Sequence, residues 1–248
     1  MLRTALIVGL SVGAVLAGAT AGQAEEEGDQ AHWKIRVELS HVRTSGNTDT
    51  ETLSGKLEAK KEGEIHRYIL KGNALHAEYE GEETANKWLL DGRWERVLRE
   101  DLFGFLTASY LRDKFSGYDY RANGGLGLGY DLIKTKQHHV KGLISTLYSQ
   151  DKFSEAGRGS ESYISGKAAI YYAWQISESV RFKENADYLV SFEDTDTYFI
   201  NSETALEVEV NRIISLGLSY SIAYQHRPPS PDFERTDTLF LASLIIDL

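Results

Sequence analysis

The sequence predicts an all-β fold class: an antiparallel transmembrane β-barrel of about twelve strands, which is an even number. First, apolar and polar residues alternate in runs from Trp33 to Leu248, as in strands whose two faces meet different environments. Second, the runs suit tilted membrane strands of roughly ten residues better than soluble strands of about five or six. Third, the connections are alternately short and long, as in single-chain barrels of the bacterial outer membrane.

Residues 1–24 are typical of a secretory signal peptide. Arg3 provides the positive start, an apolar run follows over residues 6–19, and Gly22 and Ala24 are the small residues that signal peptidase requires. A retained membrane helix is the alternative, because the apolar run approaches spanning length. We expect cleavage, which leaves a short acidic periplasmic segment, 25–32, before an outer-membrane barrel formed by residues 33–248.

The composition excludes several function classes. The 248-residue chain has 37 acidic and 27 basic side chains and a formal net charge of -10, whereas nucleic-acid binding requires clustered Lys and Arg. It contains no cysteine, so a disulfide framework, a thiolate metal site and a lipoprotein anchor are excluded. We expect no cofactor and no bound metal.

The first expected strand shows the alternation clearly. Trp33, Ile35 and Val37 share one face, and Lys34 and Arg36 share the other. The same period-two pattern recurs along the chain. We expect the strands at residues 33–42, 48–61, 65–77, 86–98, 102–112, 119–131, 138–149, 161–174, 179–192, 197–210, 213–226 and 234–248.

The connections fall into two sets. We expect short periplasmic turns at 62–64, 99–101 and 211–212. We expect longer extracellular loops, rich in Gly, Ser, Pro and acidic residues, at 78–85, 113–118, 150–160 and 227–233. An even number of strands then places both termini in the periplasm. Aromatic residues near the strand ends suit interfacial girdles, although aromatic residues favour strands in general; they are Tyr79, Trp88, Phe103, Phe105, Tyr110, Tyr118, Tyr120, Tyr130 and Tyr148.

The last expected strand is apolar on both faces. Its outer face alternates to the chain end, and this pattern resembles the signal that the barrel assembly machinery recognises, although Leu248 stands where that signal prefers Phe. Either the inner face packs against another side chain inside the barrel, or the register differs. The outer residues are Thr238, Phe240, Ala242, Leu244, Ile246 and Leu248, and the apolar inner residues are Leu239, Leu241 and Ile245.

Three segments resemble a known family. Thr44-Ser-Gly-Asn-Thr-Asp49 follows the first strand, Tyr110 to Phe115 has the pattern Tyr-x-x-Asp-x-Phe, and residues 123–130 have the sequence Asn-Gly-Gly-Leu-Gly-Leu-Gly-Tyr. Together they are similar to the YdiY-like, salt-induced outer-membrane proteins, over essentially the whole mature chain. The resemblance implies an outer-membrane barrel of uncharacterised role, with no catalytic residues to carry over.

The polar faces of the strands predict a lumen lined by charges of both signs. Two neighbouring strands predict a ladder of ion pairs, with Lys183 opposite Glu207 and Arg181 opposite Glu209. Glu184 is an exception, because it falls on the otherwise apolar outer face. The candidate lumen-lining residues are Lys34, Arg36, Glu38, Lys56, Glu58, Lys60, Asp91, Arg93, Glu95, Arg181, Lys183, Glu203, Glu207 and Glu209.

No motif predicts an enzyme. Outer-membrane acyl hydrolases use a His and a Ser two residues apart, and none of the seven histidines has a Ser at that spacing; a pair assembled from different strands stays open. The glycine run at 125–129 lacks the following helix of a dinucleotide site and is more typical of strand glycines. His138 and His139 lack further metal ligands nearby. The acidic residues near 78–83 and 193–196 either share divalent cations with lipopolysaccharide or are solvated, and we favour the second.

We therefore expect a small outer-membrane channel for polar solutes, or a stress-related envelope barrel, that is monomeric and not an enzyme. The expected partners are outer-membrane lipid, lipopolysaccharide and the barrel assembly machinery, and no nucleic acid. The alternatives are an outer-membrane lipid hydrolase and a soluble periplasmic β protein. The width of the lumen would distinguish a channel from a closed scaffold. Twelve strands lie between the roughly eight that leave room only for side chains and the sixteen that enclose an aqueous channel.

Overall fold

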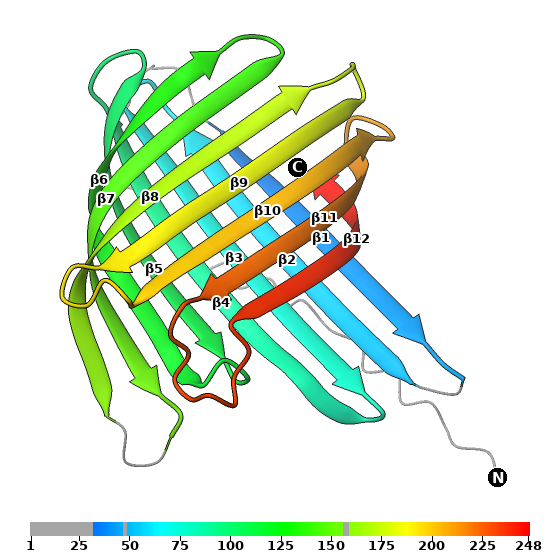
Figure 1. The fold of residues 1–248 in the computed structure, drawn as a ribbon. Helices are drawn as coiled ribbons and strands as arrows, with labels where there is room; N and C mark the ends of the chain where they lie inside the picture. The colour runs from blue at the N-terminus through cyan, green and yellow to red at the C-terminus, as the bar shows by residue number, and fades with distance from the viewer. Residues whose placement is uncertain (1–31, 47–48, 156–158) are drawn as a thin grey trace, which may run out of the picture. The chain divides into compact units, whose positions relative to one another are not determined.

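The computed structural model describes residues 32–46, 49–155 and 159–248, and in it twelve antiparallel strands close into one barrel (Figure 1). Each strand pairs with the next in the sequence, and β12 closes on β1. Within the described part, no helix is long and apolar enough to cross a membrane. The predicted fold class and even strand number are confirmed. The strands are β1 (Trp33–Thr44), β2 (Thr50–Glu62), β3 (His66–Tyr79), β4 (Glu82–Val97), β5 (Leu102–Asp113), β6 (Tyr118–Lys134), β7 (His138–Phe153), β8 (Ser160–Gln175), β9 (Val180–Ser191), β10 (Tyr198–Glu209), β11 (Ile214–Gln225) and β12 (Thr236–Asp247).

The first and last strands begin and end at the same end of the barrel. Ile35 and Leu248 exchange backbone hydrogen bonds of 3.0 and 2.8 Å. The short connections that follow β2, β4, β6, β8 and β10 lie at this end, which we call the turn end; the opposite end is the loop end. The predicted signal peptide, and all of the predicted acidic segment except His32, lie outside the described residues.

One predicted long loop is a tight hairpin. β3 continues to Tyr79 and β4 begins at Glu82, so Glu80 and Gly81 alone connect them, with φ values of 53° and 81°. Two successive residues with positive φ form a two-residue hairpin turn, and Gly adopts the second conformation without steric penalty. The expected loop over 78–85 was wrong, because charged residues at the ends of long strands still pair with the neighbouring strand.

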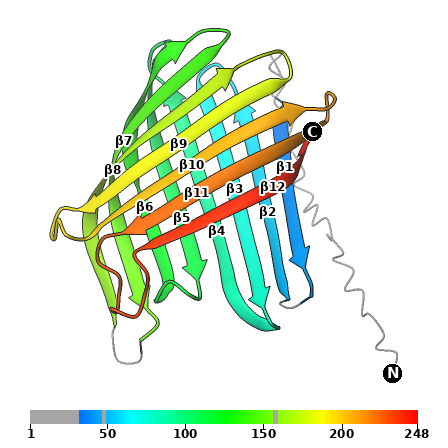
Figure 2. The same ribbon diagram turned by 45° about the vertical axis from the view of Figure 1, so that its right-hand side comes forward.

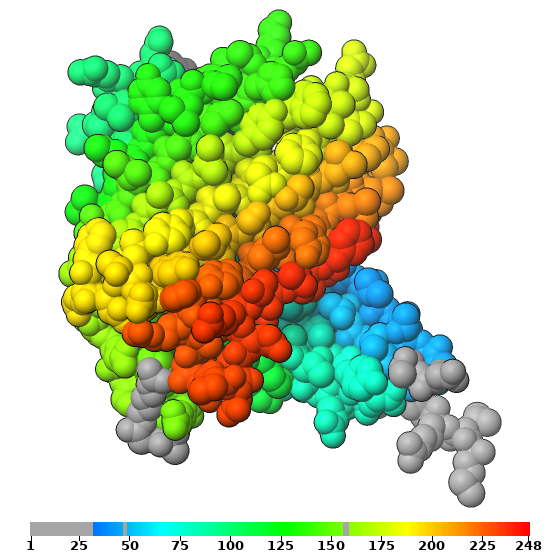
Figure 3. Space-filling view, in the orientation of Figure 1, coloured from blue at the N-terminus to red at the C-terminus, as the bar shows by residue number. Residues whose placement is uncertain are grey.

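The outer face of the barrel is broadly apolar. Water-soluble proteins rarely expose contiguous apolar patches larger than a few hundred Å², whereas a barrel in lipid presents an apolar band. Side chains cover the wall from β8 to β12 in the space-filling view (Figure 3). Exposed large apolar residues include Leu57, Leu70, Leu90, Leu106, Leu126, Ile144 and Leu218.

Glu184, the charged residue on the otherwise apolar outer face of β9, is hydrogen-bonded to two residues of β10. Glu184 accepts hydrogen bonds from Ser202 Oγ, at 2.8 Å, and from Thr204 Oγ1. A polar group that faces lipid is unfavourable unless it is hydrogen-bonded. Two hydroxyl donors therefore make this carboxylate tolerable at its place in the wall.

Three aromatic residues predicted for a girdle lie buried instead. Phe103 and Phe105 of β5 are 1% and 5% exposed, and Tyr118 is 4% exposed. A Cβ on Gly129 would overlap the ring of Phe103, and one on Gly127 would overlap the ring of Phe105. The glycines of β6 therefore make room for large side chains inside the barrel, which confirms that this glycine run is a strand feature. The girdle assignment of these three residues was wrong.

β12 is apolar on both faces because its inner side chains fill part of the lumen. Leu241 and Ile245 are 2% and 1% exposed, whereas Phe240 and Leu244 are exposed on the outer face. A Cβ on Gly217 of β11 would lie 2.9 Å from Cδ1 of Ile245, so the glycine makes room for this side chain. The expected alternation is right for β12, and packing inside the barrel explains its apolar inner face.

Candidate functional site: a charged lumen

A cavity of about 390 Å³ lies inside the barrel toward the turn end. Among the described residues that line it are eight Lys and Arg side chains and six Glu side chains. These charges come from seven of the strands, because each strand directs alternate residues inward. The predicted lumen residues that line this cavity are Arg36, Glu38, Lys56, Glu58, Lys60, Arg93, Glu95, Lys183, Glu203 and Glu207.

Four predicted lumen residues lie elsewhere. Asp91 lines a second, smaller cavity of about 70 Å³. Lys34 is largely exposed near the turn end and lies 3.6 Å from Glu62. Arg181 reaches the edge of the charged cluster, whereas Glu209 is exposed at the end of β10.

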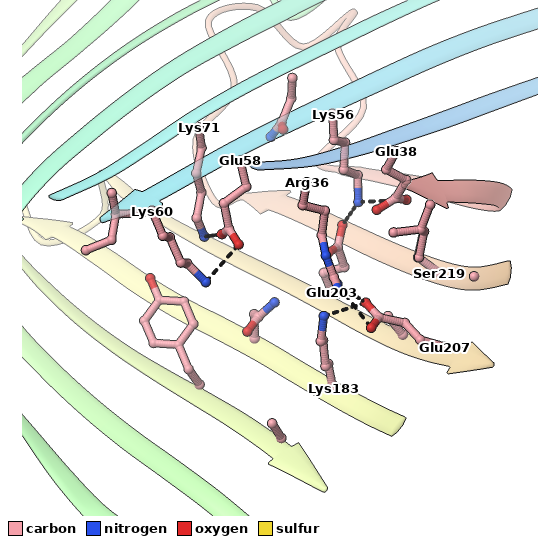
Figure 4. A pocket seen from close by; sticks show the side chains of 18 of the residues that line it. Arg36, Glu38, Lys56, Glu58, Lys60, Lys71, Lys183, Glu203, Glu207 and Ser219 are labelled. Carbon is pink, nitrogen blue, oxygen red and sulfur yellow. Dashed lines mark hydrogen bonds and ion pairs between the residues drawn. The ribbon is translucent and has the colours of Figure 1, made fainter. Parts of the chain in front are cut away.

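Glu207 lies close to three cationic side chains from opposite sides of the seam between the first and last strands, and Figure 4 shows two of them, Arg36 and Lys183. Glu207 Oε1 accepts a hydrogen bond from Arg36 Nη1 at 2.9 Å and another from Lys183 Nζ. Arg181 Nη1 lies 3.9 Å from Glu207 Oε2. Arg36 also donates to Asp247 through Nε at 2.7 Å.

The ladder expected between β9 and β10 is present with a shifted register. Glu207 faces Arg181 directly, and Lys183 faces Ala205. Lys183 therefore reaches Glu207 along the diagonal, which long side chains span readily. The expected pairing of Arg181 with Glu209 was wrong, because the register is displaced by two residues from the expected one.

Two further ion-pair clusters lie on β2. Glu58 lies 2.7 Å from Lys60 Nζ and 3.4 Å from Lys71 Nζ. Lys56 bonds to Glu203 across the lumen and lies 3.8 Å from Glu38. Figure 4 shows these side chains meeting inside the barrel from strands on different sides.

The most deeply buried charge is Glu95 of β4, which is 0% exposed. Its Oε1 lies 2.9 Å from Arg93 Nε, and its Oε2 accepts a hydrogen bond of 3.4 Å from Arg67 Nη1. The contact with Arg93 Nε is an ion pair without good hydrogen-bond geometry. The guanidinium of Arg67 lies 5.6 Å from the ring centroid of Phe103, and that of Arg93 lies 5.8 Å from the ring centroid of Phe105. Cation–π attraction therefore adds to the ion pairs.

Arg67, Lys71 and Lys141 line the cavity although they were absent from the predicted set. Arg67 and Lys71 lie on β3 in alternation with the exposed Tyr68 and Leu70. The same period-two rule that identified the other lumen residues identifies these two. The signal was therefore present in the sequence.

Large side chains fill the lumen nearer the loop end. Arg121 Nε donates to Asp151 Oδ1 at 3.1 Å, and Tyr163 Oη donates to Asp151 Oδ2 at 2.9 Å. The Arg121 guanidinium lies 3.6 Å from the ring centroid of Phe199. Phe199 packs with Leu147 and with other buried residues. We call Arg121, Asp151, Tyr163, Phe199 and Leu147 the lumen cluster.

The connection between β11 and β12 crosses the mouth at the loop end. A Cβ on Gly117, which follows β5 on the far side of the barrel, would lie 2.8 Å from Phe233 Cε2 and 2.9 Å from Pro229 Cγ. Gly117 has a φ of 80°, a conformation that side chains rarely adopt. The loop and the lumen cluster together obstruct the axial route through the loop end.

The histidines and carboxylates of the described residues show no hydrolase or metal arrangement. None of the hydrogen bonds that histidines make within the described residues goes to a serine. His139 Nε2, for example, contacts Asp131 at 2.9 Å. In the described part of the chain no three His, Asp or Glu side chains are grouped to hold a metal ion. The loop carboxylates have cationic partners, since Arg227 pairs with Asp194 and Asp196.

A closed antiparallel barrel with an apolar outer face and a charged interior defines a β-barrel of the outer-membrane type. The chain belongs to the family described as "Protein of unknown function, DUF481", whose model matches residues 37–248. It is 28% identical over 208 residues to "Uncharacterized protein YdiY" of Escherichia coli (strain K12), covering 84% of this chain and 80% of that protein. The predicted resemblance is confirmed.

A solved outer-membrane channel shares this fold. An outer membrane channel from Pseudomonas putida F1 superposes with a TM-score of 0.54 at 9% identity, covering 91% of this chain and 100% of that chain. The NanC porin has a TM-score of 0.49 at 12% identity, covering 87% of this chain and 98% of that chain. At these identities, the likeness to the Pseudomonas channel shows a common fold.

Proposed function

We propose that this protein is a narrow outer-membrane channel for small polar solutes. The observation that carries the proposal is the charge-lined cavity of about 390 Å³ inside a barrel with an apolar outer face. Charged groups in a lumen retain water and exchange readily with a polar solute. The cavity also falls in the size range of small-molecule sites, roughly 300 to 1,000 Å³.

The lumen cluster sets the conductance in this proposal. Phe199 is 6% exposed and lies under the Arg121 guanidinium within this cluster. Solute passage along the axis requires these side chains to move or to be removed. We therefore expect the wild-type channel to conduct weakly.

Conductance of the refolded mature protein in planar bilayers tests the proposal. The Phe199→Ala variant is expected to raise single-channel conductance by about threefold, because it empties a layer that side chains otherwise fill. Ile200→Ala is the matched control: it removes the neighbouring side chain, which is exposed on the outer face, and leaves conductance unchanged. If neither the wild type nor Phe199→Ala conducts, the channel proposal is wrong.

The proposal includes a cellular location and an orientation in the membrane. Residues 1–24 direct export and are removed, the barrel inserts in the outer membrane through the assembly machinery, and both termini lie in the periplasm. The protein is a monomer, and its loop end faces lipopolysaccharide. The apolar outer face and the common end of β1 and β12 support this arrangement. Protease accessibility of an epitope inserted after Gly81, in intact cells, tests the orientation.

A closed scaffold that responds to salt stress is the second candidate, and the obstruction at the loop end favours it. Two results together would support the scaffold. Neither the wild type nor Phe199→Ala would conduct, and cells that lack the gene would lose viability in high salt. We propose no enzymatic activity, since none of the hydrogen bonds that the described histidines make goes to a serine. Phospholipid turnover by the purified protein would contradict this part of the proposal.

A further inference from the structure

β1 and β12 pair along only part of their length, although both strands are described in full. Their register runs from Arg36 and Asp247 to Leu39 and Leu244, which is four residue pairs. The other neighbouring strands are in register over eleven to fifteen residue pairs. If the ladder continued toward the loop end, Val42 would face Leu241. The two strands instead diverge in both ribbon views (Figures 1 and 2).

The unpaired part of this seam begins beside the charged cavity. Glu38 of β1 and Ile245 of β12 both line the cavity. Ser243 Oγ donates to Glu38 Oε1 at 2.9 Å, at the last point where the two strands approach. We call the gap between the unpaired residues of β1 (40–44) and of β12 (236–243) the parting. It therefore begins next to the cavity wall.

The β12 edge of the parting is apolar toward the outside and toward the lumen, whereas the β1 edge beyond Leu39 is mixed, with Val42 between His41 and Arg43. Leu39 and Phe240 are exposed on the outer face, and Val42 is also exposed. Leu241 faces inward beside them and is buried. An apolar chain in the parting would meet Phe240 and Leu241 on the β12 side and Val42, between His41 and Arg43, on the β1 side. The axial route, by contrast, is filled at the loop end by the lumen cluster and crossed by Phe233.

Unpaired strand edges need polar partners. Backbone N–H and C=O groups that face hydrocarbon without a partner are strongly unfavourable, so membrane barrels normally close every seam. A passage that admits water or polar head groups at its inner side satisfies these groups. The partial pairing of β1 and β12 is thus compatible with a wet opening and not with a wall sealed in dry lipid.

We propose that the parting between β1 and β12 is a lateral passage between the lumen and the outer leaflet for anionic amphiphiles with one apolar chain. This inference rests on the proposed channel function and names a solute class for it. The head group enters the cavity, whose lining has eight Lys and Arg against six Glu. The apolar chain lies between the strand edges. The charged lining of the cavity thus suits the head group, and the adjacent apolar residues of the strand edges suit the apolar chain.

A cross-link over the parting tests the proposal. The chain contains no cysteine, so Val42→Cys with Leu241→Cys creates one defined pair, closed by oxidation or, where the thiols stay apart, by a short bis-maleimide. Val37→Cys with Ile246→Cys is the control, because these residues already face each other in the paired part. The mature protein in proteoliposomes is then given decanesulfonate, decyltrimethylammonium or chloride.

We expect the cross-link at Val42 and Leu241 to slow decanesulfonate uptake by about tenfold, and the control cross-link to leave it unchanged. Chloride conductance stays within about twofold in both, because the axial route is separate. Decyltrimethylammonium is taken up more slowly than decanesulfonate in every reduced form. Equal decanesulfonate uptake with and without the cross-link at Val42 and Leu241 would overturn the lateral passage.

Two other outcomes are informative in different ways. If no form conducts chloride while decanesulfonate uptake responds to the cross-link, the axial channel is wrong and the lateral passage stands. If the reduced protein purifies as a dimer that the cross-link separates, the free strand edges are a docking surface for a second copy, and the lateral passage is wrong.

Discussion

Glu95 provides the sharpest test of how the charged lumen is held together. The carboxylate is 0% exposed and lies between Arg93, at 2.9 Å, and Arg67, at 3.4 Å. Glu95→Gln retains the size of the side chain and removes its charge. The two guanidinium groups then face each other in a confined space without a counter-charge.

The expected loss of stability follows from this geometry. Breaking a buried ion pair by removing one partner costs about 3 to 5 kcal/mol. The side chains of Arg93 and Arg67 keep 14% and 19% exposure to the cavity, so water relieves part of the penalty. We therefore expect Glu95→Gln to lower the free energy of unfolding by about 3 kcal/mol, near the low end of that range.

The measurement is urea unfolding of the protein in lipid vesicles, followed by the gel mobility of the unheated barrel. Glu62→Gln is the matched control, because Glu62 pairs with Lys34 at an exposed site, where such a pair contributes about 0.5 kcal/mol or less. Adding Arg93→Met to Glu95→Gln should restore part of the loss, since one unpaired charge is removed. A Glu95→Gln protein within about 1 kcal/mol of the wild type would refute the reasoning.

Two further predictions concern the inner wall. Gly129→Val should prevent assembly of a heat-resistant barrel, because its side chain would overlap the buried ring of Phe103; Gly81→Asn, at the exposed hairpin, should assemble normally, since Asn tolerates positive φ. Replacing Lys60 and Lys71 together by Glu should shift the reversal potential of the Phe199→Ala channel toward cation selectivity, because both lysines border the cavity around Glu58. An unchanged reversal potential would show that ions do not pass this part of the lumen.

Much of the architecture was accessible from local pattern. Period-two alternation predicted twelve antiparallel strands, and the inward positions of Arg36, Glu58 and Glu207 follow from the same alternation. The same alternation also places Arg67 and Lys71 on the inner face of β3, where both line the cavity. Face assignment is a local property, because successive side chains of a strand point to opposite sides.

Other features depended on how distant strands are staggered. Lys183 was expected opposite Glu207 and instead reaches it along a diagonal. Phe103 and Phe105 were expected at an interface and instead lie inside, where the glycines of β6 make room. Both outcomes are set by register and by the volume available across the sheet, neither of which is encoded within one strand.

The sequence by itself determined the fold class, the apolar outer face and the mixed charge of the interior, because each depends on alternation within single strands. The tertiary structure decided which charges meet, that the lumen cluster fills the loop end, and that β1 and β12 pair over four residues. The physical reason is closure: strand tilt and stagger fix the neighbours of every inward side chain only when the last strand meets the first.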